Sequence, residues 1–476
     1  MSFADLGWLT VGLLNFLILG YFVLVTGFQL WTCLHGLATL KRYSMRVRSL
    51  DLSEVLSLGG APPITLLAPA YNEEATCVPA ISSLMNLKYP DYEVIVVNDG
   101  SKDATLDRLI EAFDLVPSPR FPSAAVPTKP VRGIYKSRIH PTLLVVDKVN
   151  GGKSDALNAG LNHSRAPLVC AMDADTLLER EALTRIVRPF LEDDSTVAVG
   201  GVIRIANGCS VQAGELTQVA MPTNWLARIQ ILEYLRSFLA GRVGWAGLDA
   251  TLIISGAFGL FRRQTVVAVG GWDPTTVGED MELVVRMHRY CRERGQPYRI
   301  RFVPDPVAWT ECPESLRVLA RQRERWQRGL TETMVRHRTM LFNPRYGHIG
   351  MIAFPYFFFL EMLGPVLELA GYFSFAILVA LGKASGPFVA AFLALAFGFG
   401  LALSIAGIAL EELSFRRYPR LRDLGILLAA ALVEAVGYRQ LSGWWRVQGL
   451  IGAWRRKRGW GAMTRKGFTQ PKAQST

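Results

Sequence analysis

The feature that most constrains this chain is a set of long apolar segments, the first of which spans residues 7–31 without a charge. As a helix, this segment would be about 37 Å long, enough to cross a hydrocarbon core of about 30 Å. Only 19% of the 476 residues are charged, whereas a typical soluble domain has about 25%. The sequence therefore predicts a membrane protein, and it excludes a disordered chain and a small disulfide-rich domain.

The first apolar segment is expected to be a retained helix and not a cleaved signal peptide, because Asp5 and no Lys or Arg precedes it. Basic residues follow it at positions 41, 42, 46 and 48, so the positive-inside rule places residues 50–345 in the cytoplasm. Further apolar segments lie at residues 350–381, 384–410 and 424–443. Basic clusters on both sides of the last segment favour the cytoplasm, so the number of membrane crossings stays open.

The net charge of the chain is +12, and part of the excess of basic residues lies beside these apolar segments. Trp444, Trp445 and Trp454 stand beside the basic cluster at residues 455–458, a pattern typical of a membrane interface. We therefore expect contact with membrane lipids and no nucleic-acid partner. The six cysteines are scattered, with no CxxC pair, which predicts reduced thiols and no structural zinc.

Between residues 60 and 310, short apolar runs alternate with helical patterns. This alternation predicts an α/β domain with a mostly parallel sheet, in which ligands bind beyond the carboxyl ends of the strands. Ser101 is expected to cap a helix, and the proline-rich residues 116–141 are expected to form a surface insertion. The predicted strands are residues 64–71, 92–98, 142–147, 168–172 and 197–205.

Polar motifs follow several of these strands. Tyr71 and Glu73 come after the first strand and Asp99 after the second, where an acidic side chain can bind a base or a ribose; the alternative is a simple turn. A Gly-Gly-Lys turn ending at Lys153 suits an anionic nucleotide through its amides and its charge. It is not a P-loop, because Asp147 stands where that motif needs glycine.

Asp173 and Asp175 follow the strand at residues 168–172 and, by the two-residue period of a strand, point to the same side. Two neighbouring carboxylates favour a hard divalent cation with oxygen ligands; the alternative is an exposed loop, in which such a pair is common.

Two further motifs lie closer to the C-terminal apolar segments. Glu279 and Asp280 open a helix, where acids are favoured by the helix dipole but can also serve as a general base. Gln322, Arg325 and Trp326 belong to a basic helix that either binds lipid head groups or faces a diphosphate and a sugar.

Taken together, these motifs resemble the membrane-integrated, processive family 2 glycosyltransferases, which include the cellulose, chitin, hyaluronan and poly-N-acetylglucosamine synthases. The resemblance covers about residues 63–329 and rests on the two aspartates of a DxD motif, a TED-like motif and a Q-x-x-R-W motif. The segment around Ser255 and Gly256 is similar to the acceptor side of the poly-N-acetylglucosamine synthases. One departure is Gly278, which replaces the usual Thr.

The resemblance implies a GT-A-type domain that transfers sugar from a UDP-sugar to a growing β-linked extracellular polysaccharide. The transfer would invert the configuration at the anomeric centre of the donor sugar. The resemblance also implies that Tyr71, Glu73, Asp99, Lys153 and Asp173 bind the nucleotide. Mg²⁺ or Mn²⁺ would be held by Asp173 and Asp175. The base would be Asp280 beside Glu279, and the acceptor or diphosphate would contact Ser255, Gly256, Gln322, Arg325 and Trp326.

The expected organisation is an N-terminal membrane helix with its basic flank (1–48), the GT-A-type domain (49–312), interfacial helices (313–348), C-terminal membrane or interfacial helices (349–452) and a basic tail (453–476). We expect a multi-pass cell (inner) membrane protein with a cytoplasmic catalytic domain. Its partners would be the UDP-sugar, the growing glycan, lipids and an accessory membrane or export subunit. Glu361 and Glu368 are expected to line a polar path for export.

Two other functions stay open from the sequence. A non-processive enzyme that glycosylates a lipid carrier would need the same donor site, and a non-catalytic membrane scaffold would keep only the domain's shape. The sugar is not identified by any residue pattern.

Overall fold

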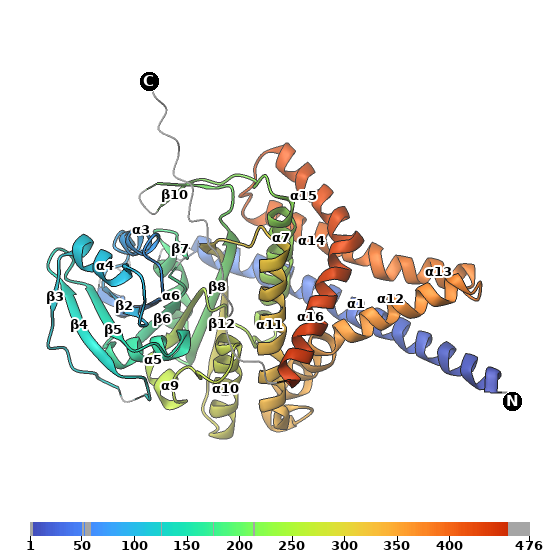
Figure 1. Cartoon of the computed structure of the whole chain (residues 1–476), viewed down its shortest axis with the longest axis horizontal. Helices are drawn as coiled ribbons and strands as arrows, with labels where there is room; N and C mark the ends of the chain where they lie inside the picture. The colour runs from blue at the N-terminus through green and yellow to red at the C-terminus, as the bar shows by residue number, and fades with distance from the viewer. Residues whose placement is uncertain are drawn as a thin grey trace.

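The computed structural model describes residues 3–49, 52, 59–124, 126–174, 176–212 and 215–455. An α/β unit occupies one end of the molecule and long helices extend from the other (Figure 1). The strands are β1 (Ile64–Ala70), β2 (Tyr92–Asn98), β3 (Leu115–Pro117), β4 (Val131–Ser137), β5 (Leu143–Lys148), β6 (Leu168–Met172), β7 (Leu177–Leu178), β8 (Thr196–Ile205), β9 (Ser210–Gln212), β10 (Glu215–Gln218), β11 (Phe258–Arg262) and β12 (Arg299–Thr310).

Within the described ranges, ten of these strands form one sheet in the order β3-β4-β5-β2-β1-β6-β11-β8-β12-β7. The five strands predicted from the sequence are confirmed as β1, β2, β5, β6 and β8. The helices of this unit are α3 (Cys77–Leu84), α4 (Thr105–Phe113), α5 (Lys153–His163), α6 (Ala182–Glu192), α9 (Arg263–Ala268) and α10 (Glu279–Glu293). The α/β prediction is therefore confirmed.

The sheet is mixed, and the expectation of a mostly parallel sheet was wrong, because antiparallel strands flank the parallel strands on both sides. Strands β5, β2, β1 and β6 are parallel, but β11 is antiparallel to both of its neighbours, β6 and β8. The first residue of β11, Phe258, pairs with Met172, the last residue of β6. The chain therefore enters β11 at the carboxyl edge of the parallel strands and has to run back.

Two local expectations were also wrong. The proline-rich stretch 116–141 contributes to β3 and β4, which extend the sheet because β4 pairs antiparallel with β5 and β3 pairs antiparallel with β4. Ser101 does not cap α4, which begins at Thr105, because its hydroxyl accepts a hydrogen bond from the backbone N–H of Asn72 at 3.0 Å. That bond instead joins the loops that follow β1 and β2.

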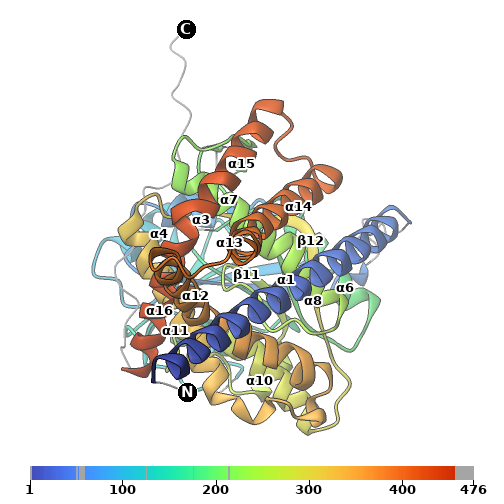
Figure 2. The ribbon, with the colours of Figure 1, turned by 90° about the vertical axis from the view of Figure 1, so that its right-hand side faces the viewer.

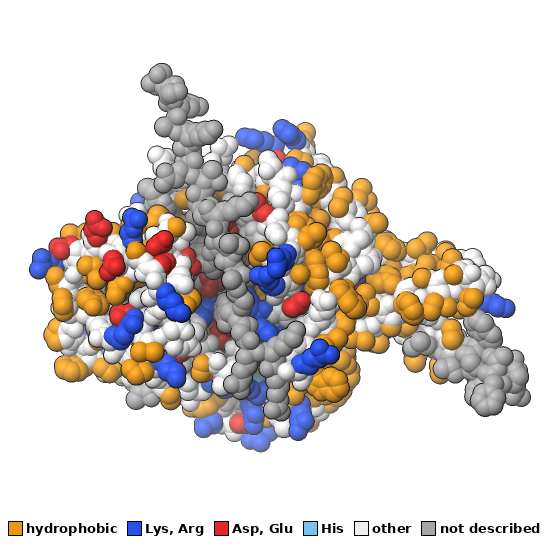
Figure 3. All heavy atoms as spheres, in the orientation of Figure 1, with side chains coloured by type: hydrophobic (Ala, Val, Ile, Leu, Met, Phe, Trp, Pro, Cys, Tyr) orange, Lys and Arg blue, Asp and Glu red, His pale blue; other side chains and the backbone are white. Residues whose placement is uncertain are grey.

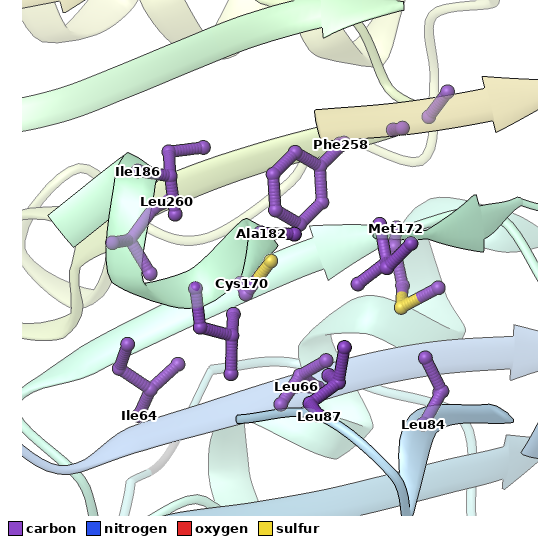
Figure 4. Close-up of a cluster of buried hydrophobic side chains, with 14 of the residues drawn as sticks. Ile64, Leu66, Leu84, Leu87, Cys170, Met172, Ala182, Ile186, Phe258 and Leu260 are labelled. Atoms are coloured by element: carbon purple, nitrogen blue, oxygen red, sulfur yellow. The ribbon is translucent and has the colours of Figure 1, made fainter. Parts of the chain in front are cut away.

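The core between the sheet and its helices is built from the buried runs that predicted the strands. Figure 4 shows Leu66 of β1, Cys170 of β6 and Leu260 of β11 beside Ile186 of α6, and all four are fully buried. Burying a leucine or isoleucine side chain contributes about 1.5–3 kcal/mol. This packing holds the strands whose ends carry the polar motifs.

A second layer of helices lies between the sheet and the apolar end of the molecule (Figure 1). Helix α11 packs closely against α16, and α8 against the N-terminal helix. The elements of this interface layer are α7 (Trp225–Tyr234), the π-helical η2 (Leu235–Arg242), α8 (Val243–Gly247), α11 (Leu316–Arg336), the 3₁₀ turns η3 (Arg338–Met340) and η4 (Pro344–Tyr346), and α16 (Arg439–Trp454).

The remaining helices form the apolar end, where hydrophobic side chains dominate the surface (Figure 3). The long N-terminal helix runs diagonally across this end in Figure 2. These elements are α1 (Phe3–Ser49), η5 (Ile349–Ala353), η6 (Tyr356–Met362), α12 (Gly364–Ala380), α13 (Gly386–Leu393), η7 (Ala394–Gly398), α14 (Phe399–Ser414), α15 (Leu421–Val433) and η8 (Glu434–Tyr438).

Within the described residues, two helical segments are long and apolar enough to cross a bilayer, Val11–Val47 and Gly386–Ser414. The pair Ile349–Met362 and Gly364–Ala380, bent by 42°, makes a third if it counts as one span. The predicted segment at 424–443 is interrupted at Gly437, which has a φ of 93°. The chain is therefore a membrane protein, as the sequence predicts.

Candidate active site

The polar motifs gather at the carboxyl ends of the parallel strands, facing the interface helices. A cavity of about 1060 Å³ opens there, and it is lined by groups from α5, from the end of β6 and from the loop before β11. The start of α10 and the middle of α11 also line the cavity. Of the predicted site residues, those that line it are Lys153, Asp173, Ser255, Gly256, Glu279, Asp280, Gln322, Arg325 and Trp326.

Lys153 connects three of these elements. Its Nζ lies 2.6 Å from Oδ1 of Asp173 and 3.1 Å from Oε1 of Glu279, and it donates to the carbonyl oxygen of Gly256 at 3.2 Å. Burial alone would lower the pKa of Lys153, but the two carboxylates outweigh it, so its pKa is raised. Burial raises the pKa of Glu279, and Lys153 offsets this only in part. Lys153 therefore stays charged and holds the end of β6 against the start of α10.

Asp280 is oriented by backbone amides. The N–H of Gly256 donates to its Oδ2 at 3.0 Å, and the N–H of Met281 donates to its Oδ1 at 2.8 Å. A Cβ at Gly256 would lie 2.8 Å from Nζ of Lys153, so a side chain there would displace the lysine from its present contacts. Each carboxylate oxygen keeps a second lone pair, with which it can accept a proton from a ligand in the cavity.

Asp99 is buried, and its carboxylate is fully engaged. It accepts hydrogen bonds from Nζ of Lys148 at 2.7 Å and from the backbone N–H groups of Gly151 at 2.9 Å and Gly152 at 2.7 Å. Burial nevertheless raises the pKa of Asp99. The amides expected to bind a nucleotide are thus occupied by Asp99, which positions the turn before α5. A contact between Asp99 and the nucleobase of the donor stays a prediction.

Tyr71 and Glu73 lie beyond the end of β1, at the same edge of the sheet. The Tyr71 side chain is 44% exposed, which leaves its ring free to stack on a ligand. Glu73 accepts a hydrogen bond from the Thr76 hydroxyl at 2.5 Å, and its backbone N–H donates to Thr105 at 2.8 Å. Neither residue lines the described part of the cavity, and their nucleotide contacts remain predictions.

The predicted metal ligands are Asp173 and Asp175, which follow β6. Asp173 is partly exposed to the cavity, and Asp175 lies outside the described residues. Within the residues that the structure describes, no three His, Cys, Asp or Glu side chains are grouped closely enough to hold a metal ion. Asp173 is thus the one predicted metal ligand whose position can be stated.

The α11 motif presents three groups to the cavity. Trp326 is 41% exposed, and the guanidinium of Arg323 stacks 4.5 Å from the centroid of its ring. Arg323 in turn pairs with Glu233 of α7 at 2.5 Å, and the Tyr438 hydroxyl donates to the same Glu233 oxygen at 3.0 Å. The Oε1 atom of Gln322 is buried and has no hydrogen-bond partner among the described residues. This amide oxygen is available to a ligand.

The start of α10 and the middle of α11 are in contact at two glycines, Gly278 and Gly329. A Cβ built on Gly278 would lie 2.8 Å from Cα of Gly329, and a Cβ on Gly329 would lie 2.7 Å from Cα of Gly278. Such contacts require the absence of side chains. The departure at Gly278 therefore has a structural reason, because it lets the helix that carries Trp326 approach Glu279 and Asp280.

The same cavity continues among the apolar helices, where Glu361 and Glu368 line it as predicted. Both are also paired, Glu361 with Arg446 at 3.1 Å and Glu368 with Arg439 at 3.3 Å. Glu361 and Glu368 therefore line the cavity and are ion-paired at the same time, and their part in a path for export stays a prediction. Pairing offsets the cost of placing a charge in an apolar layer.

Sequence reasoning missed several cavity residues in the interface helices. Glu233, Arg236 and Arg242 all line the cavity. The only signal for them was the presence of charged residues in the otherwise apolar helical stretch 225–247, and this signal does not say what they face.

Two family descriptions match this chain. Glycosyl transferase family 2 matches residues 65–220, and Glycosyl transferase family group 2 matches residues 168–403. The two ranges together include every element that lines the candidate site from Lys153 to Trp326.

Among curated relatives, the poly-β-1,6-N-acetyl-D-glucosamine synthase of Staphylococcus aureus is 32% identical over 279 residues, covering 57% of this chain and 56% of the relative. The probable glycosyltransferase YdaM of Bacillus subtilis is 29% identical over 64% of this chain and 65% of its own length. The matches thus span little more than half the length of these relatives.

Among solved structures, a mannosyltransferase from Pyrobaculum calidifontis in complex with GDP-Man and Mn²⁺ has a TM-score of 0.52 and 17% identity. The superposition covers 93% of this chain and all of that one. At this identity the likeness concerns the fold, which is of the GT-A type.

Proposed function

Because this chain belongs to glycosyltransferase family 2, we propose that it transfers sugar from a UDP-sugar to a growing β-linked extracellular polysaccharide. The observation that carries this proposal is a single cavity whose lining includes Asp280 and Trp326 as well as Glu361 and Glu368 from the apolar helices. A transferase that adds one sugar to a lipid needs the donor site but no polar cavity among its membrane helices. The name of the Staphylococcus aureus relative makes N-acetylglucosamine the first sugar to test.

In the proposed reaction, Asp280 removes a proton from the acceptor hydroxyl, whose oxygen then attacks the anomeric carbon of the donor as the nucleotide diphosphate leaves. Attack in line with the leaving group inverts the anomeric centre, so an α-linked donor yields a β-linkage. Lys153 stays positively charged beside Asp173 and Glu279 and attracts the diphosphate. The proposed nucleotide contacts are Tyr71 and Glu73, together with Asp99 through the Gly151–Gly152 turn that its carboxylate holds.

On the acceptor side, Trp326 would stack on a sugar face, since its ring is exposed to the cavity. The unpartnered amide oxygen of Gln322 would accept from a sugar hydroxyl, and Arg325 would face the leaving diphosphate. Ser255 and Gly256 would border the acceptor because they line the cavity beside Asp280.

A divalent cation fits this donor set. Asp173 offers a partly exposed carboxylate, and Mg²⁺ in such sites is typically held by one or two carboxylates together with substrate phosphates. We propose that Asp173 and Asp175 hold Mg²⁺ or Mn²⁺, which supplies positive charge for the leaving diphosphate. The Mn²⁺ named with the Pyrobaculum calidifontis structure supports this choice of metal class.

We further propose that the protein is a multi-pass inner-membrane enzyme whose catalytic domain faces the cytoplasm, where UDP-sugars are made. The basic residues that follow the first apolar segment support this orientation. The polar cavity among the membrane helices would then lead the product outward, within a lipid environment and with an accessory export subunit as a further partner.

The test is to supply purified protein with radiolabelled UDP-sugars one at a time and to measure product size with and without EDTA. We expect a long polymer from UDP-N-acetylglucosamine and none in EDTA. A single transferred sugar would replace the proposal by lipid glycosylation, and the absence of any transfer would favour a scaffold. Full activity in EDTA would exclude the metal assignment.

A further inference from the structure

Arg242 is a cavity residue to which neither the motifs nor the proposed mechanism gives a role. It ends η2 and directly precedes α8, which packs on the N-terminal helix α1. Its side chain lines the cavity, and the charge of Asp280 acts on it. Arg242 and the candidate base Asp280 therefore line the same cavity, which Arg242 reaches from a helix that packs on α1.

Four of the other cavity arginines differ from Arg242 in having carboxylate partners. Arg236 pairs with Glu434 at 2.6 Å, Arg323 with Glu233 at 2.5 Å, Arg439 with Glu368 at 3.3 Å and Arg446 with Glu361 at 3.1 Å. These pairs balance the charge of the cavity wall.

Arg242 has no such partner in the described part of the chain. Its guanidinium stacks on the Phe238 ring, 3.8 Å from the centroid, and its buried Nη1 makes no hydrogen bond. Burial lowers the pKa of Arg242 to about 10, which still leaves it charged at neutral pH. A buried donor on a charged group costs free energy when it is left without an acceptor. The Nη1 group of Arg242 can therefore donate a hydrogen bond to a ligand that enters the cavity.

The chemistry of that ligand follows from the surroundings. A guanidinium stacked on a ring directs its N–H groups outward in its own plane, where they match hydroxyl or carbonyl oxygens. The donor side already has Lys153 beside Asp173, whereas Arg242 reaches the cavity from η2, which packs on α1 and α14. A sugar whose hydroxyl reaches Asp280 would present its other oxygens to Arg242.

We propose that Arg242 binds the terminal sugar of the acceptor through neutral oxygen atoms, and so orients the attacking hydroxyl toward Asp280. This inference rests on the proposed function, because it assumes a glycan acceptor. It adds an acceptor-binding group outside all of the motifs that identified the site.

The test compares Arg242→Gln and Arg242→Lys with the wild type in detergent or nanodiscs. UDP affinity is measured by calorimetry, and transfer is measured with added β-1,6-linked N-acetylglucosamine oligosaccharides as acceptors. Arg228→Gln is the matched control, since Arg228 is on the neighbouring helix α7 and does not line the described cavity.

We expect Arg242→Gln to raise the apparent KM for the acceptor by roughly 10- to 100-fold, the effect of losing a charged hydrogen bond. UDP affinity should stay within about twofold, and Arg242→Lys should recover part of the loss because it keeps the charge without the planar fork. The intact UDP affinity also shows that the variants are folded.

A parallel loss of UDP affinity in both variants would overturn the inference in favour of a diphosphate contact or a structural role. An unchanged acceptor KM would overturn it as well. Failure of the proposed function itself is distinguishable, because the wild-type protein would then neither bind UDP nor extend the oligosaccharide.

Discussion

Replacing Gly329 with alanine should push apart the two helices that carry the candidate base and the acceptor-stacking tryptophan. The added Cβ would lie 2.7 Å from Cα and 2.9 Å from N of Gly278, the residue directly before Glu279 and Asp280. Both contacts are with backbone, which cannot rotate away as a side chain can. Relief of the clash to an ordinary distance requires a shift of roughly 1 Å between α10 and α11.

The magnitude of the effect follows from this shift. Overpacking at a tight contact typically lowers the free energy of unfolding by about 1–3 kcal/mol. A displacement of about 1 Å between reacting groups can lower a rate by about 10²-fold. We therefore expect Gly329→Ala to fold, to bind UDP almost normally, and to lose roughly 99% of its transfer rate.

The assay is the initial rate of sugar transfer, with UDP affinity and thermal unfolding measured on the same preparation. Gly425→Ala in α15 is the matched control, because nothing lies within 4 Å of a Cβ at that position. The control should be neutral or slightly stabilised, as expected for alanine within a helix. If Gly329→Ala kept more than half of the wild-type rate, the contact would not set the geometry of the site.

The remaining predictions concern the base, the export path and acid stability. Asp280→Asn should keep UDP affinity and lower transfer by roughly 10²- to 10⁴-fold, and loss of UDP binding would reassign Asp280 as a nucleotide ligand. In sealed inverted vesicles, polymer should collect in the lumen and resist added glycosidase. The double variant Glu361→Leu and Glu368→Leu should shorten this product with UDP binding intact, whereas polymer that stays digestible outside would assign export to another protein. Burial alone would raise the pKa of Glu282, but its contacts with His337 and Arg286 outweigh burial, so the pKa is lowered. Ionised Glu282 therefore stabilises the folded protein at pH values above the ordinary pKa of glutamate, and this contribution is lost as the pH falls through the lowered pKa. Glu282→Gln should thus flatten the acid limb of unfolding stability, and an unchanged limb would contradict this assignment.

Several features of the candidate site were predictable because they depend on local patterns. A buried apolar run followed by Asp173 indicates a strand end whatever surrounds it, and the structure places Asp173 there. The acids at 279 and 280 open α10 for the same local reason. The orientation of β11 was not predictable, because it depends on where the chain returns after the interface helices.

The hydrogen bonds of Asp99 show what a sequence motif does not predict. The residue lies at the predicted strand end, but its carboxylate binds the Gly151 and Gly152 amides, which come from a loop more than 50 positions further along. Two motifs that each looked suited to a nucleotide thus bind each other. A motif predicts which chemistry a residue can perform, and its neighbours decide whether that chemistry is available to a ligand.

By itself, the sequence determined that this chain has apolar helices beside an α/β domain and which polar groups end the strands, because hydrophobic period and strand length are local properties. The tertiary structure alone decided that Glu361 meets Arg446, that Gly278 meets Gly329, and that Arg242 pairs with no carboxylate among the residues that the structure describes. These contacts join residues far apart in the chain, and a charged side chain in an apolar helix carries no information about its partner. Only the packing of the interface helices between sheet and membrane brings such groups into one cavity.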